Sequence, residues 1–164
     1  MARDGEQVGE LAVRGPWIAS AYYGDDASEA TFAGGWMRTG DMAQMEPDGY
    51  IRIVDRAKDL VKSGGEWIST VELEGHLLAH PAITDAAVVG VPSPKWDERP
   101  VAVIVPAPGD APSLDDIHEF LSPRVAKWWL PDAVVVTEAI PRTSVGKIDK
   151  LALRKMLSAD ESTG

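Results

Sequence analysis

A lysine preceded by glycine, Lys147, lies near the C-terminal end of the chain in the segment 141–150, which reads Pro-Arg-Thr-Ser-Val-Gly-Lys-Ile-Asp-Lys. Its ammonium group sits on a flexible stem beside Gly146, which has no Cβ, so it can approach a phosphate or carboxylate oxygen closely. A nucleotide P-loop, G-x-x-x-x-G-K-[ST], is the obvious alternative. The segment does not fit that motif, because Pro141 replaces its first glycine and Ile148 replaces its magnesium-binding hydroxyl. The segment therefore predicts either a lysine presented to an anion or an exposed lysine that caps a turn.

Two upstream segments could belong to the same site. Residues 35–41 read Gly-Trp-Met-Arg-Thr-Gly-Asp, and residues 55–65 read Asp-Arg-Ala-Lys-Asp-Leu-Val-Lys-Ser-Gly-Gly. The carboxylate of Asp41 could accept two O–H bonds from the paired hydroxyls of a ribose. The alternatives are an ordinary Asx turn at Asp41 and a surface contact between Asp55 and Arg56.

Taken in order, the three segments closely resemble the adenylate-forming superfamily, which comprises acyl-CoA synthetases, peptide-synthetase adenylation domains and beetle luciferases. The resemblance runs from about residue 9 to residue 157 and covers the C-terminal portion of such an enzyme. Residues 95–99 and 125–131 look most like the medium- and long-chain fatty-acyl-CoA synthetases. One departure is Asp97, which replaces the more usual glycine before Glu98.

The resemblance implies roles in adenylation. Asp41 would hold the ribose of ATP, and Arg56 would contact the same nucleotide. Lys147 would be the adenylation catalyst, because its charge can bridge the fatty carboxylate and the α-phosphate and offset developing negative charge. Trp67 stands where several members have an arginine that reaches the AMP phosphate, so the resemblance does not extend to that contact.

The resemblance also implies a hinge and a CoA-binding face. Lys58 falls at the junction between a large and a small domain, where a few backbone torsions would let the small domain rotate between two half-reactions. Gly64, Gly65 and Glu66 match the segment that lines the pantetheine tunnel. The alternatives are a solvated charge at Lys58 and a simple Gly-Gly turn between a strand and a helix.

The implied activity is that of an ATP-dependent fatty-acid–CoA ligase, which forms acyl-AMP and pyrophosphate and then uses CoA to give acyl-CoA and AMP. ATP and CoA would be required, with Mg²⁺ bound only through ATP. No protein metal site is predicted: His76 and His80 are spaced i, i+4, but Leu77 replaces the glutamate of the metalloprotease pattern and no third ligand is visible. The alternatives are delivery of the acyl group to a carrier protein and a non-catalytic binding module.

Composition narrows the class of protein. The chain has 164 residues, a net charge of −10 and no cysteine, which excludes disulfides and thiolate zinc sites and argues against nucleic acid as a partner. Neither a signal peptide nor an apolar stretch long enough for a bilayer is present. We therefore expect a cytoplasmic protein, and a peripheral membrane contact of the full enzyme is left open. The acyl chain length and oligomeric state do not follow from this sequence.

The predicted fold is α+β, with two parts. Residues 1–56 predict a β-hairpin remnant of a large N-terminal domain, with strands near residues 9–15, 42–45 and 50–54. Residues 57–164 predict a small C-terminal domain with a central sheet flanked by helices. We expect its strands at 86–91, 100–105 and 133–136, and its helices after Ser69, Ser113 and Asp149. The chain would then be a truncation that starts at an expression methionine and is inactive by itself.

Overall fold

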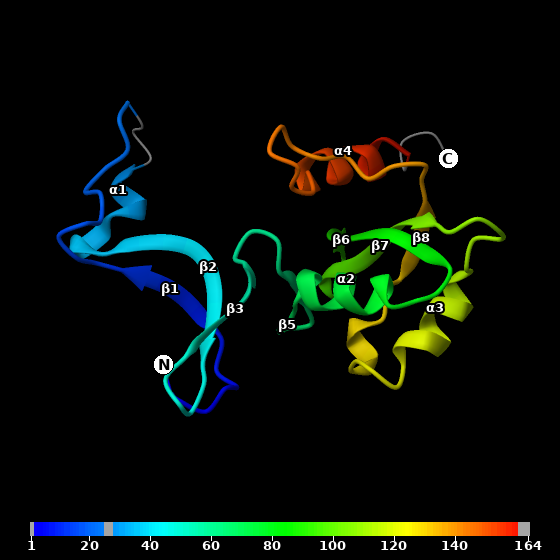
Figure 1. The fold of residues 1–164 in the computed structure, drawn as a ribbon, viewed down its shortest axis with the longest axis horizontal. Coiled ribbons are helices and arrows are strands. Elements are labelled where there is room, and N and C mark those ends of the chain that lie inside the picture. The colour runs from blue at the N-terminus through cyan, green and yellow to red at the C-terminus, as the bar shows by residue number, and fades with distance from the viewer. Residues whose placement is uncertain (1, 25–27, 161–164) are drawn as a thin grey trace. The chain divides into compact units, whose positions relative to one another are not determined.

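The computed structural model describes residues 2–24 and 28–160 (Figure 1). The chain divides into two compact units, Met1–Lys58 and Asp59–Gly164. This division falls two residues after the predicted boundary at 56–57, and the assignment of the units to a large and a mobile domain stays a prediction. Within the described residues, no helix is long and apolar enough to cross a membrane.

The first unit is built around a three-stranded antiparallel sheet in the order β1-β2-β3. The predicted hairpin is confirmed, and its turn is closed by the Glu46 amide donating to the Tyr50 carbonyl at 2.8 Å. Strand β2 begins earlier than expected because Met37 and Arg38 pair with β1. The elements are β1 (Gly9–Val13), α1 (Ser28–Thr31), η1 (Ala33–Gly35), β2 (Met37–Met45) and β3 (Ile51–Arg56).

The second unit contains a five-stranded sheet in the part of the chain that the structure describes. Strand β7 is central: it pairs antiparallel with β6 along its whole length and parallel with β8. Strand β4 joins the same strand at Ser63 and Asp97, and β5 pairs with β4. The strands are β4 (Val61–Ser63), β5 (Glu66–Ile68), β6 (Ile83–Ser93), β7 (Asp97–Pro106) and β8 (Ala133–Val136).

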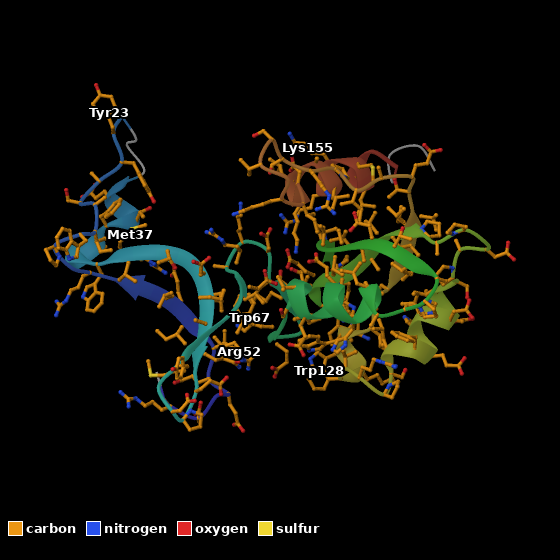
Figure 2. All side chains as sticks on the ribbon, in the orientation of Figure 1. Tyr23, Met37, Arg52, Trp67, Trp128 and Lys155 are labelled. Carbon is orange, nitrogen blue, oxygen red and sulfur yellow. The ribbon has the colours of Figure 1, made fainter. Side chains whose placement is uncertain are left out.

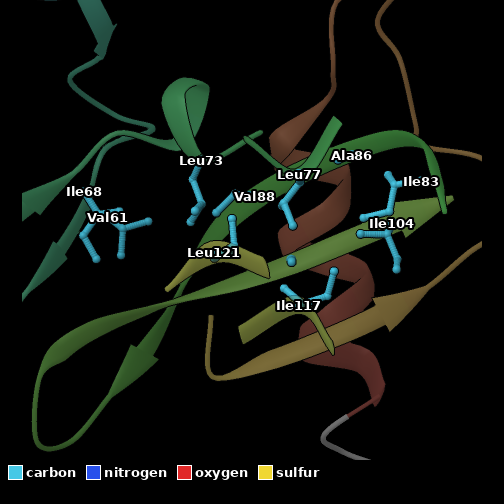
Figure 3. Packing of buried hydrophobic residues seen from close by; sticks show 11 residues of the cluster. Val61, Ile68, Leu73, Leu77, Ile83, Ala86, Val88, Ile104, Ile117 and Leu121 are labelled. Atoms are coloured by element: carbon cyan, nitrogen blue, oxygen red, sulfur yellow. The ribbon is translucent and has the colours of Figure 1, made fainter. Parts of the chain in front are cut away.

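Helices cover both faces of this sheet. Val88 and Ile104 point into a core with α2 and α3, which Figure 3 shows. Val89 and Val103 point the other way and pack with Leu153 of α4. This alternation is the two-residue period of a strand buried on both faces. The helical elements are α2 (Thr70–Leu78), α3 (Leu114–Leu121), η2 (Lys127–Trp129) and α4 (Lys150–Asp160).

The helix starts follow the predicted caps. The Ser69 hydroxyl accepts from the Glu72 amide at 3.2 Å, and Ser113 and Asp116 form a reciprocal capping box. The hydrogen bonds from Ser113 lower the pKa of the Asp116 carboxyl. Asp149 caps α4 by accepting from the Ala152 amide at 3.0 Å. The α+β prediction is confirmed.

Candidate functional site

Asp41 and Arg56 lie directly opposite each other on β2 and β3. Nε of Arg56 is 2.8 Å from Oδ1 of Asp41, and its Nη1 donates to the Thr39 carbonyl at 3.2 Å. Both side chains remain solvent-accessible, at 51% for Arg56 and 26% for Asp41. A carboxylate has about four lone-pair sites, so this ion pair leaves acceptor capacity on Asp41. The structure thus brings together two residues that were predicted to contact one nucleotide.

Lys58 is the last residue of the first compact unit, and the division between the units follows it directly. The preceding residue is fixed within that unit, because the Ala57 amide donates to the Gly40 carbonyl at 2.8 Å. A change in backbone torsions at Lys58 would therefore leave the β2–β3 hairpin undisturbed. This position suits a hinge, which remains a prediction.

Residues 141–150 form a closed loop, here called the lysine loop. The Thr143 amide donates to the Lys147 carbonyl at 2.7 Å, and the Lys147 amide donates back to the Thr143 hydroxyl at 3.2 Å. A β-bridge between Arg142 and Ile148 joins the two arms below this turn. Gly146 has a φ of 81°, a conformation that costs glycine little. The backbone of Lys147 is therefore fixed while its side chain is exposed.

The two other cations of the lysine loop, Arg142 and Lys150, are paired with carboxylates, whereas Lys147 has no such partner among the described residues. Arg142 contacts Asp85 of β6 at 2.6 Å and donates to the Gly146 carbonyl at 3.2 Å. Among the described residues, the ammonium group of Lys147 has no ion-pair or hydrogen-bond partner. The loop thus presents one available cation on a fixed backbone.

Gly64 and Gly65 form the turn between β4 and β5, here called the glycine hairpin (residues 61–68). The turn links two strands, not the strand and helix considered from sequence. Both glycines have positive φ, 61° and 91°. The Gly64 amide donates to the Trp96 carbonyl at 2.8 Å. A Cβ at Gly64 would lie 3.0 Å from Cε3 of the Trp96 ring, so a larger residue must displace that ring.

An open cavity of about 510 Å³ adjoins the glycine hairpin. Two indole rings flank it, and Trp128 is half-exposed. Figure 2 shows Trp128 and Lys155 of α4 on opposite sides of the sheet of the second unit. The cavity is lined by Ser63, Gly64, Glu66, Trp96, Arg99, Lys127, Trp128 and Asp132. Gly64 and Glu66 of the predicted CoA set line this cavity, and Gly65 lies between them in the turn without lining it.

Arg99 organises the wall of this cavity, and sequence reasoning did not identify it. Its side chain is only 12% exposed, and its guanidinium contacts Asp132 at 2.8 Å. It also donates to the Ser63 hydroxyl and the Trp128 carbonyl, both at 2.8 Å, and to the Leu130 carbonyl at 2.9 Å. It thereby connects β4 with the segment that precedes β8. Its position three residues after Trp96 was the one sequence feature that could have placed Arg99 near this cavity.

The two histidines considered as a metal pair have other contacts. The His80 ring accepts from the Ala82 amide at Nδ1 and packs edge-on against Phe120. His76 faces Glu72 at 4.0 Å. Over residues 2–24 and 28–160, no group of three or more histidines and acidic residues is placed to hold a metal ion. Trp67, at the position of the family's phosphate-contacting arginine, is 46% exposed on β5.

The chain is similar in sequence to known proteins. Residues 72–147 match the model of the AMP-binding enzyme C-terminal domain. A long-chain-fatty-acid–CoA ligase from Thermus thermophilus is 51% identical over 93% of this chain and 29% of its own length. A 3-methylmercaptopropionyl-CoA ligase from Ruegeria lacuscaerulensis is 49% identical over 94% of this chain and 28% of its own length. This chain therefore spans less than a third of the length of these relatives.

A solved structure shows the same fold. The o-succinylbenzoate CoA synthetase of Bacillus subtilis, in complex with its acyl-adenylate intermediate, superposes with a TM-score of 0.81. The two proteins are 34% identical, over 94% of this chain and 31% of the synthetase. With the ordered motifs and the two ligase relatives, this match identifies the chain as a member of the adenylate-forming superfamily, whose C-terminal portion it resembles along nearly its whole length.

Proposed function

We propose that this chain supplies the C-terminal part of an ATP-dependent acyl-CoA ligase, with one nucleotide-binding hairpin and one mobile domain. The observation that carries this proposal is the arrangement of the second unit. It presents Lys147, which has no partner among the described residues, on a fixed loop before α4, and it has a cavity at the glycine hairpin. Figure 2 shows Lys155 of α4 and Trp128 of this cavity on opposite sides of the sheet. A ligase that alternates between two half-reactions needs two such faces on one domain.

In the first half-reaction, an oxygen of the fatty carboxylate attacks the α-phosphorus of ATP, and the bond to the β-phosphate oxygen breaks to release pyrophosphate. Lys147 would bridge the carboxylate and the α-phosphate through its ammonium group, which positions both reactants and offsets developing negative charge. No proton needs to be removed from a carboxylate, so Lys147 would not act as a base. The ammonium group has no partner among the residues that the structure describes, which supports this role.

The nucleotide would also contact the first unit. Asp41 would accept hydrogen bonds from the ribose, and Arg56, held beside it at 2.8 Å, would contribute the adjacent positive charge. The family uses ATP and CoA. We propose that this ligase does so as well, with Mg²⁺ carried by the ATP phosphates.

In the second half-reaction, the CoA sulfur attacks the carbonyl carbon of acyl-AMP, and AMP leaves with the electron pair of the broken C–O bond. Gly64, Gly65 and Glu66 would line the path of the pantetheine arm. The absence of side chains at the two glycines permits close backbone approach, and the Trp96 ring offers an apolar wall. Rotation at Lys58 would exchange the two faces.

The acid substrate is proposed to be a fatty acid, because the T. thermophilus relative is a long-chain-fatty-acid–CoA ligase. A cytoplasmic location, and any peripheral membrane contact of the full enzyme, remain predictions. A non-catalytic module is disfavoured, since Asp41, Arg56 and Lys147 are all present and the first two are in contact.

The experiment uses the complete ligase with ATP, Mg²⁺, CoA and a ladder of fatty acids that includes 3-methylmercaptopropionate, with products identified by mass spectrometry. Acyl-CoA and AMP are the expected products. Acyl-AMP that accumulates without acyl-CoA would indicate a carrier protein or another acceptor. The absence of both products across the whole ladder would overturn the ligase proposal.

A further inference from the structure

A buried ion pair joins the start of α4 to α2. Nζ of Lys150 is 2.9 Å from Oε1 of Glu74, and each side chain is only 11% exposed. The same ammonium group donates to the hydroxyl of Thr70, which is fully buried. Lys150 is the first residue of α4, and Thr70 is the first residue of α2. The adenylation chemistry described above makes no direct use of these groups.

Glu74 connects this ion pair to the sheet. Its Oε1 also accepts the backbone N–H of Val88 at 2.9 Å. Strand β6 lies at the edge of the sheet in the described residues, so this N–H points outward and needs a side-chain acceptor. A single carboxylate therefore holds the strand edge, helix α2 and the first residue of α4.

The lysine loop ends at this anchor. Lys147 lies three residues before Lys150, and the intervening Asp149 both caps α4 and donates its amide to the Pro141 carbonyl at 2.8 Å. The other arm of the loop is held by Arg142 on Asp85, which also belongs to β6. Because the loop is closed on itself, its orientation follows from where its two arms attach.

We infer that Lys150, together with Glu74 and Thr70, is a positioning residue for Lys147 in adenylation; this inference rests on the proposed function. A buried ion pair is weak evidence for a gain in stability, since apolar residues of similar volume often serve equally well. A pair with directed hydrogen bonds does specify where the helix begins. The Lys150–Glu74 pair therefore fixes the point at which the lysine loop joins α4. A misplacement of about 1 Å in a catalytic group can lower the rate about 100-fold.

The test is the double variant Lys150→Met/Glu74→Gln in the complete ligase. It removes both charges together, and the glutamine carbonyl can still accept the Val88 N–H. We expect a midpoint of unfolding close to that of the wild type. The kcat for acid-dependent pyrophosphate release should fall about 10- to 100-fold. Thioester formation from supplied acyl-AMP should remain within about twofold, because the glycine hairpin is not touched.

A second test variant and a control variant accompany the double variant. Thr70→Val deletes only the hydroxyl that accepts from Lys150, and should lower adenylation selectively by about fivefold, the effect of one hydrogen bond. Lys155→Met makes the same chemical change as Lys150→Met on the same helix at an exposed position, and should change neither half-reaction.

The outcomes separate this inference from the proposed function. Full adenylation in both the double variant and Thr70→Val, or equal loss of both half-reactions, would overturn the positioning role. Full adenylation in Lys147→Ala would overturn the catalytic role of Lys147 on which this inference rests, whereas the ligase proposal itself is overturned only if the wild-type enzyme forms neither acyl-AMP nor acyl-CoA. If the double variant does not fold, the selective loss in Thr70→Val decides the question.

Discussion

The lysine loop and the turn of the glycine hairpin are attached to the second unit in different ways. The lysine loop is anchored by charged side chains, Arg142 on Asp85 and Lys150 on Glu74. In the glycine hairpin, the turn at Gly64 is held by a backbone hydrogen bond and by the ring of Trp96, and charged side chains hold only the strand β4 that leads into it, as Arg99 does at the Ser63 hydroxyl. A point charge must be aimed from a distance, whereas a path for a thin pantetheine arm must be kept clear of side chains.

This contrast indicates that the two faces can be damaged separately. Removing charge should affect the lysine loop, and adding volume should affect the glycine hairpin. An enzyme that uses one face per half-reaction would then lose one half-reaction at a time. Variants that remove a charge and variants that add volume therefore test whether the two faces serve different half-reactions.

The largest effect is expected for Lys147→Ala. Loss of the ammonium group should lower adenylation about 100- to 1,000-fold, as for other preorganised groups that stabilise transition-state charge. Thioester formation from supplied acyl-AMP should survive. Pyrophosphate release and acyl-CoA formation are measured separately, with Lys155→Ala as the matched control on α4. Equal loss in both assays would contradict the division of labour between the two faces.

Arg99→Met should lower the stability of the chain most. The guanidinium of this largely buried side chain contacts Asp132 and three other oxygen acceptors, which would lose their donor. We expect a loss of about 3 kcal/mol in the free energy of unfolding. Urea unfolding of the 164-residue chain measures it. Arg99→Lys should recover only part of this loss, because an ammonium group cannot reproduce the planar fork. A fully stable Arg99→Met would show that the cavity wall does not depend on this residue.

Gly64→Ala should impair thioester formation and spare adenylation, the reverse of Lys147→Ala. The added Cβ meets the Trp96 ring at 3.0 Å and forces a left-handed backbone on alanine. The Trp96 ring must shift to relieve this contact, and we expect its shift to lower the rate of thioester formation from acyl-AMP about 10-fold. Gly75→Ala in α2, where nothing lies within 4 Å of the added Cβ, is the control and should leave both rates unchanged. A normal thioester rate in Gly64→Ala would remove the glycine hairpin from the CoA path.

The smallest effect is expected at Asp97, the one non-glycine among the described residues with a positive φ, 75°. It ends the turn between β6 and β7 and pairs with Ser93 and Ser63. Asp97→Gly should be more stable than Asp97→Ala by about 1 kcal/mol, because glycine alone adopts this conformation without strain. Loss of the exposed contact with Lys62, at 3.4 Å, should matter little. The urea midpoints of Asp97→Gly and Asp97→Ala measure this difference in stability. Equal midpoints would mean that the backbone at residue 97 is not strained.

Much of the local structure could be predicted from the sequence. Strand β8 has the predicted bounds, and the Ser113–Asp116 capping box starts α3 as expected. The ends of β2, β6 and β7 were less predictable, because each continues past its apolar run where a partner strand extends the pairing. The turn at Gly64 was recognised, but not the short strand β5 that follows it, since three residues are too few for a periodic pattern.

The sequence by itself determined the family motifs, the helix starts and the apolar centres of the longer strands, because each depends on side chains within a few positions of one another. Only the tertiary structure decided which of these residues meet. Lys150 reaches Thr70 across 80 residues, and Arg99 joins β4 to the segment that precedes β8. Asp41 meets Arg56 through the register of β2 on β3. Such contacts depend on strand register and on the packing of helices over the sheet, which no local pattern of residues specifies.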